Sequence, residues 1–133
     1  MKYEFTEEYY TGIKMIDEEH AKLFEIANRA YDLLTNQFKL DKYDEIAAVL
    51  EELRDYTKYH FSHEEEYMKS INYGKRFSQM HQHAQFIEKL ESYDLKDIDE
   101  NQHAGLLEII DFLAVWLLGH IKGMDKRIPK VEE

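Results

Sequence analysis

KYDEIAAVLEELRDYTKYHFSHEEEYMK, residues Lys42 to Lys69, is a long stretch of helical pattern that contains neither glycine nor proline. Its apolar residues recur every three or four positions, as one face of an α-helix requires. The positions on this face are Ile46, Val49, Leu50, Leu53, Thr57, His60, Glu64 and Met68. The pattern predicts one amphipathic helix over about 42–69 whose apolar face also carries a histidine and a glutamate.

The same spacing continues on both sides of this stretch, over about 17–37, 75–92 and 99–126. Short polar segments with glycine, asparagine or aspartate separate the four patterns, and strand alternation is nowhere sustained. Four amphipathic helices with short connections predict an all-α fold, an antiparallel up-down four-helix bundle. An extended N-terminal arm of about residues 1–15 precedes it, and we expect residues 1–133 to form a single domain.

Composition narrows the classes of function. A net charge of -11 makes binding to nucleic acid or to an anionic membrane surface unlikely, because both need positive charge on the protein. Cysteine is absent, which excludes disulfides and Cys-ligated metal clusters. Long apolar runs and a signal-peptide pattern are also lacking. We therefore expect a soluble cytoplasmic monomer.

Several polar residues keep the helical register of their apolar neighbours. These residues are His20, His60, Glu64, His83 and His120. A buried carboxylate without a partner costs several kcal/mol, so an inward Glu64 needs a cation or a hydrogen bond. A metal ion between helices would meet that need, and nitrogen and oxygen ligands without cysteine suit iron, manganese or zinc.

Two spacings support a metal site. His60 and Glu64 are four residues apart and share a helix face, whereas Glu65 is rotated away from that face and is expected in solvent. His120 and Asp125 are five residues apart and approach one point from successive turns. Each feature also has an ordinary structural interpretation. A single inward histidine is more often a hydrogen-bonded core residue, and His60 with Glu64 can be a simple (i, i+4) pair.

The third stretch contains a misleading histidine pair. In FSQMHQHAQF, Phe77 to Phe86, His81 and His83 are two residues apart and point about 200° away from each other on a helix. His83 belongs to the apolar face, on which Phe77 and Met80 are also expected, and His81 belongs to the solvent side. The inward residue one turn before His83 is Gln79.

Taken together, these motifs resemble the hemerythrin family, and specifically its bacteriohemerythrins. The family pattern is read in IDEEH, ending at His20, and in HFSHEE, which gives His60 and Glu64. It continues in QMHQH, ending at His83, and in HIKGMD, which gives His120 and Asp125. The likeness extends along nearly the whole chain.

The resemblance implies a non-haem di-iron centre with an oxo or hydroxo bridge that binds O2. Glu64 and Asp125 would bridge the two irons. His20 and His60 would hold the iron with an open coordination position, and His83 and His120 the other. The residues expected to keep the O2 side apolar and dry are Trp116, Leu117 and Ile121.

The chain departs from the family pattern at Gln79, where relatives carry a further histidine ligand. Gln79 could bind metal through its amide oxygen, hold a water in the vacant position, or leave the second metal weakly held. His81 or His63 could substitute only in a distorted helix, for example at a π-bulge. A more open centre favours metal exchange and reaction with peroxide.

These considerations leave three functions open. The favoured one is a protein that binds or senses O2, in which case a separate signalling partner would read the state of the centre. The alternatives are a di-iron oxidase or peroxidase acting on H2O2 or O2, and an iron-holding stress module. Manganese or zinc could occupy one of the two sites.

Overall fold

The computed structural model describes residues 2–131, which contain helices and no β-strand. The helical elements are η1 (Glu7–Tyr9), α1 (Lys14–Thr35), α2 (Tyr43–Ser70), α3 (Arg76–Glu91), α4 (Leu95–Glu100), α5 (Gln102–Gly123) and η2 (Asp125–Arg127). The predicted all-α class is confirmed.

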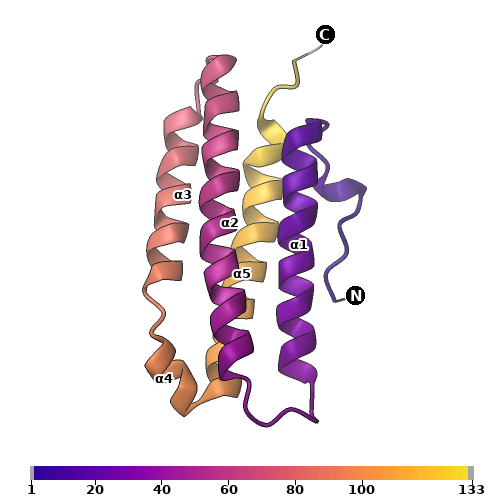
Figure 1. The fold of residues 1–133 in the computed structure, drawn as a ribbon. Coiled ribbons are helices and arrows are strands. Elements are labelled where there is room, and N and C mark those ends of the chain that lie inside the picture. The colour runs from indigo at the N-terminus through magenta and orange to yellow at the C-terminus, as the bar shows by residue number, and fades with distance from the viewer. Residues whose placement is uncertain (1, 132–133) are drawn as a thin grey trace.

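The four long helices α1, α2, α3 and α5 lie side by side, and the N-terminal segment runs along the outside of α1 (Figure 1). Helix α1 packs against α2 and α5, and α2 packs against α3. The short helix α4 lies at the end of the molecule where α5 begins, and it packs against α5.

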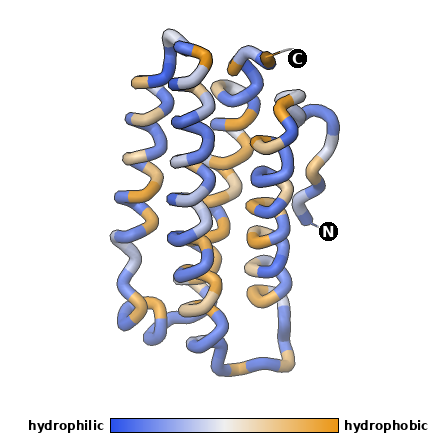
Figure 2. Tube along the Cα trace, turned by 45° about the horizontal axis from the view of Figure 1, so that its top comes forward, coloured by the Kyte–Doolittle hydropathy of each residue, from blue (hydrophilic) through white to orange (hydrophobic). Residues whose placement is uncertain are grey.

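Two apolar clusters fill the interior. Between them lies a layer of buried polar residues, here called the polar level: His20, His60, Glu64, Gln79, His83, His120 and Asp125. The larger cluster includes Leu53 and Leu23, and the smaller one includes Ile16 and Met68. Along α1, His20 therefore lies between Ile16 and Leu23, at a level where both neighbours are buried. Most of the buried residues are apolar, and hydrophobic positions recur between hydrophilic ones along the helices (Figure 2). A polar group at this level is sealed from water on both sides.

Helix α5 is the most apolar helix of the four. By length and composition alone the segment Gln102–Arg127 could cross a membrane. The helix instead supplies a large share of the buried core, through Leu106, Ile109, Ile110, Leu113, Leu117 and Ile121.

The first helix begins at Lys14, three residues before the predicted start at about residue 17. Asp17 lies in the first turn of α1 and its carboxylate accepts hydrogen bonds from the backbone N–H groups of Thr11 and Gly12, at 2.8 and 3.1 Å. Gly12 has a φ of +83°, a conformation that glycine adopts without steric cost. The acidic residue thus fixes the loop that leads into α1.

The predicted fourth helix, 99–126, is shorter than expected at both ends. Asn101 has φ −147° and ψ 76°, which are not helical angles, so the chain breaks there between α4 and α5. Helix α4 has a separate N-cap, Asp94, whose side chain accepts a hydrogen bond from the backbone N–H of Lys96. At the other end α5 stops at Gly123, and Asp125 belongs to η2.

The inward face of α3 differs from the sequence pattern at two positions. Phe77 and Met80 were expected on the apolar face, but they are 69% and 38% exposed. The guanidinium of Arg76 lies 4.7 Å from the centre of the Phe77 ring. The buried residues of this helix are Gln79, His83, Phe86 and Leu90.

We expect Leu53→Ala to lower the free energy of unfolding by about 2–5 kcal/mol, because Leu53 is fully buried and its removal leaves a cavity. Urea unfolding followed by circular dichroism measures this change. Leu107→Ala is the matched control, since Leu107 is on α5 and 39% exposed. Equal losses in the two variants would contradict the assignment of the core.

Candidate metal centre

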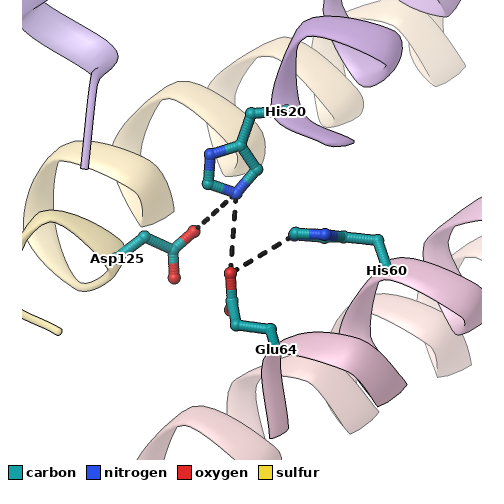
Figure 3. Close-up of side chains that lie close together, drawn as sticks. All are labelled: His20, His60, Glu64 and Asp125. Carbon is teal, nitrogen blue, oxygen red and sulfur yellow. Dashed lines mark ion pairs between the residues drawn. The ribbon is translucent and has the colours of Figure 1, made fainter. Parts of the chain in front are cut away.

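Two buried carboxylates, Glu64 and Asp125, lie at the centre of the polar level. Helix α2 supplies Glu64, and η2 supplies Asp125 at the point where the chain leaves α5. On one side, His20 Nε2 lies 3.1 Å from Asp125 Oδ2 and 3.6 Å from Glu64 Oε2. His60 Nε2 lies 3.3 Å from the same Glu64 oxygen (Figure 3).

The other side repeats this arrangement with the remaining carboxylate oxygens. His83 Nε2 lies 3.1 Å from Glu64 Oε1, and His120 Nε2 lies 3.2 Å from Asp125 Oδ1. Each carboxylate therefore presents one oxygen to each pair of imidazoles. The ligand atoms of each half lie within 4.8 Å of one another. The halves share both carboxylates, so they form two adjoining groups of four ligands.

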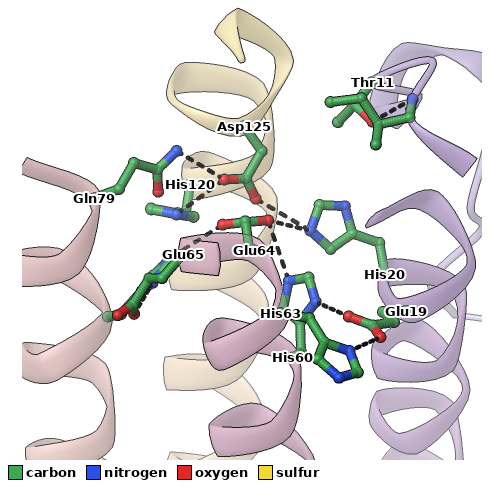
Figure 4. A network of polar contacts seen from close by, with 12 residues as sticks. Thr11, Glu19, His20, His60, His63, Glu64, Glu65, Gln79, His120 and Asp125 are labelled. Carbon is green, nitrogen blue, oxygen red and sulfur yellow. Dashed lines mark hydrogen bonds and ion pairs between the residues drawn. The ribbon is translucent and has the colours of Figure 1, made fainter. Parts of the chain in front are cut away.

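The outer ring nitrogens of three histidines are each held by one acceptor. His60 Nδ1 lies 2.8 Å from Glu19, His83 Nδ1 lies 2.8 Å from Glu65, and His120 Nδ1 lies 2.9 Å from the Gln82 amide oxygen. Figure 4 shows the first of these contacts within the wider network. An ionised carboxylate only accepts hydrogen bonds, so the imidazole must donate from Nδ1. In the neutral form of each ring, the form that binds a metal ion, the Nε2 lone pair then points at the central carboxylates.

This arrangement leaves polar atoms without hydrogen-bond partners in a buried place. Within residues 2–131 these atoms include His20 Nδ1 and Nε2, both Glu64 oxygens, Gln79 Oε1, His83 Nε2 and His120 Nε2. Buried polar groups are normally satisfied, and acceptors that face each other across about 3 Å repel unless a cation lies between them. Metal cations would satisfy these atoms, and the nitrogen and oxygen donors suit iron, manganese or zinc.

The electrostatics of the cluster favour positive charge at the imidazoles. Burial lowers the pKa of His20, but the adjacent Asp125 and Glu64 carboxylates outweigh it and raise this pKa to about 9. Burial raises the pKa of Glu64, yet the neighbouring imidazoles hold it well below its usual value. The level is therefore built around buried negative charge that protons or metal ions can balance.

Gln79 faces the cluster from α3 and is fully buried. Its side-chain N–H donates to Asp125 Oδ1 at 3.0 Å, on the side of His83 and His120, while its amide oxygen has no partner. His81 is exposed, and His63 contacts Glu19 rather than the central carboxylates. The structure thus places Gln79 and His83 on the inward face, as the sequence predicts, and it places neither His81 nor His63 at the centre.

Aromatic rings cover the half that contains His83 and His120. The Trp116 ring stacks on His120 at 4.3 Å between centroids, and Phe61 stacks on His83 at 3.9 Å. Leu117 and Ile121 are buried in the larger core cluster. Trp116 therefore contacts the half opposite to the expected O2 side, and the O2-pocket role of these three residues stays a prediction.

Helical spacing did not identify the residues that hydrogen-bond to the outer nitrogens of the imidazoles. Glu65 was expected in solvent, and this was wrong because its carboxylate reaches across from α2 to His83 on α3. Glu19, which is 8% exposed, contacts both His60 and His63. The sequence does contain a hint of this role for Glu19. It directly precedes His20 and is therefore rotated by about 100° from it, toward the neighbouring helix.

The fold and this cluster define a helical protein with buried histidines and carboxylates that could hold a metal cation. A family model described as "Hemerythrin HHE cation binding domain" matches residues 11–129. The chain belongs to the hemerythrin family. This confirms the resemblance seen in the four sequence motifs.

Individual relatives support the same assignment. The chain is 46% identical over 120 residues to a bacteriohemerythrin of Clostridium acetobutylicum, covering 90% of this chain and 93% of the relative. A bacteriohemerythrin of Pseudomonas aeruginosa is 33% identical over 117 residues, covering 86% and 71%. A hemerythrin-like protein of Naegleria gruberi is 28% identical over 123 residues, covering 92% and 87%. No solved structure matches the chain.

Proposed function

We propose that the chain is a cytoplasmic non-haem di-iron protein that binds or senses O2. The observation that carries the proposal is the sharing of Glu64 and Asp125, each with one oxygen toward each pair of imidazoles. The bacteriohemerythrin relatives support iron and O2 as the relevant metal and ligand. The unsatisfied buried atoms support the need for cations.

The proposed architecture is a single hemerythrin-like domain. We infer an up-down antiparallel four-helix bundle with an N-terminal arm, supported by the alternating chain direction of α1, α2, α3 and α5 in Figure 1. The arm is held to α1 by Asn28, whose side chain exchanges two hydrogen bonds of 2.8 Å with the backbone of Tyr3.

Each residue of the centre has a proposed task. Glu64 and Asp125 would contribute to both irons, whereas His20 and His60 would hold one of them and His83 and His120 the other. Bound ferrous iron supplies the electrons that O2 takes up when it binds. The apolar clusters on both sides exclude water from this level. A site closed to water disfavours side reactions such as hydrolysis and proton leakage.

We propose that Gln79 weakens metal binding beside His83 and His120. In relatives with a histidine at this position, a further imidazole would hold that metal ion. Its N–H is bound to Asp125 Oδ1, an oxygen that the metal also needs. This favours a peroxidase or oxidase acting on H2O2 as the second candidate function, because an open iron reacts more readily with peroxide. An iron-holding module without chemistry is the third.

Metal content and optical spectra separate these functions. We expect the reduced, iron-loaded protein to develop a charge-transfer band on exposure to O2, and this band should disappear on purging with argon. Rapid consumption of H2O2 with an electron donor would indicate the peroxidase instead. Iron that responds to neither oxidant would indicate the iron-holding module, and absence of bound iron would refute the proposal.

A further inference from the structure

The imidazoles of the centre differ in the residues that hydrogen-bond to their outer ring nitrogens. Glu65 contacts only His83 among the histidines, and Gln82 contacts only His120. Glu19 contacts two histidines, with Oε1 at 2.8 Å from His60 Nδ1 and Oε2 at 2.6 Å from His63 Nδ1. Figure 4 shows Glu19 between the two rings, with His63 on the side away from the central carboxylates.

The shared carboxylate fixes the protonation of both rings. Both oxygens of Glu19 accept a hydrogen bond, so Nδ1 of His60 and Nδ1 of His63 both donate. Glu19 is 8% exposed, and each of its two oxygens lies within hydrogen-bond distance of one imidazole nitrogen. An ionised acceptor behind a ligating imidazole sets its tautomer and increases its basicity.

His63 is placed to hold Glu19 from the surface. It follows His60 by three residues, so both side chains lie on neighbouring parts of one face of α2. About 35% of the His63 side chain is exposed, and its ring packs 4.1 Å from that of Tyr59. His63 Nδ1 hydrogen-bonds to Glu19 and not to Glu64 or Asp125, so we expect its effect on the centre to pass through Glu19.

We propose that Glu19 and His63 form a positioning pair that holds His60 in the orientation and tautomer needed for metal binding. His63 fixes one oxygen of Glu19, and the other oxygen fixes His60. The inference rests on the proposed function in taking His60 as a metal ligand. It adds that a surface histidine outside the ligand set controls the affinity of the His20 and His60 half.

Three variants test the pair. Glu19→Gln keeps the size of the side chain and removes its charge. His63→Phe keeps a ring beside Tyr59 and removes the N–H donor. His63→Asn places an amide N–H near the position of the lost Nδ1 and is the conservative rescue. The matched control is His81→Phe, because His81 is an exposed histidine on α3.

The first readout is Zn2+ affinity, measured by competition with a chromophoric chelator. We expect Glu19→Gln to weaken binding roughly 10- to 100-fold, the usual cost of losing an outer partner of a metal ligand. His63→Phe should weaken it several-fold, whereas His63→Asn and His81→Phe should remain near wild type. Equal losses in His63→Phe and His63→Asn would overturn the proposal, because they would indicate packing rather than hydrogen bonding.

The second readout is nuclear magnetic resonance of 15N-histidine in the Zn2+-loaded protein. We expect a protonated, slowly exchanging Nδ1 on His60 that exchanges faster in His63→Phe and recovers in His63→Asn. An unchanged exchange rate in His63→Phe would overturn the pair. Zinc has no redox chemistry, so these results stand even if the protein fails to bind O2. Conversely, reversible O2 binding with an unaffected His60 would refute only the positioning pair.

Discussion

Glu64→Gln is expected to remove metal from both positions of the centre rather than from one. Glu64 is fully buried and gives one oxygen to His20 and His60 and the other to His83. The amide keeps the volume but lacks the negative charge and one of the two acceptors. The affinity for iron should fall by more than the roughly 10- to 100-fold that loss of an outer partner causes. Iron per chain, measured by atomic absorption after desalting, checks this.

Glu66→Gln is the matched control for this variant. It removes the same charge two residues further along α2 from an exposed side chain. Its iron content should equal that of the wild type. If Glu64→Gln retained one full iron, the carboxylate would serve only one half, and the shared arrangement would be wrong. Circular dichroism of both variants verifies that the helices are intact.

Gln79→His is expected to strengthen retention of the metal beside His83 and His120. An imidazole at this buried position supplies a nitrogen donor and releases Asp125 Oδ1 from its hydrogen bond with the glutamine N–H. We expect metal to dissociate about tenfold more slowly, equivalent to ~1.4 kcal/mol. The O2-bound form should also persist longer. Stopped-flow transfer of iron to a chelator and the decay of the charge-transfer band measure the two effects.

Gln85→His provides the comparison for this second variant. It adds a histidine to the same helix at an exposed position, six residues beyond Gln79. Its metal dissociation should match the wild type. If Gln79→His left both rates unchanged, Gln79 would not contribute to the centre. A slower release without a longer-lived O2 form would show that O2 binds only in the other half.

The inward direction of the buried histidines and of Glu64 could be inferred from sequence because helical periodicity converts spacing into direction. A histidine in register with Leu23 or Leu53 must point inward, and a buried glutamate four residues after His60 must find a partner. The same argument separated His83 from His81 and identified Gln79 as the inward residue. The structure buries Gln79 and His83 and exposes His81. These conclusions needed only the 3.6-residue repeat and the cost of burying charge.

Periodicity was less informative near helix ends and on partly exposed faces. Phe77 and Met80 fit an apolar stripe yet are exposed. The break at Asn101 depends on local backbone angles, which helical spacing does not encode. The early start of α1 likewise depends on how the Asp17 carboxylate holds the preceding loop.

The sequence by itself therefore determined the helical class and the inward position of the histidines and of Glu64, because both follow from spacing within a single helix. Asp125 lies in η2, beyond the end of α5, so its place beside them was decided by the tertiary structure. Only the tertiary structure decided which oxygen faces which imidazole and which residue supports each ring from outside. Glu19 reaches from α1 to two histidines of α2, and Glu65 reaches from α2 to α3. Such contacts join different helices, so they depend on the packing distance and relative rotation of neighbours, which no single helix specifies.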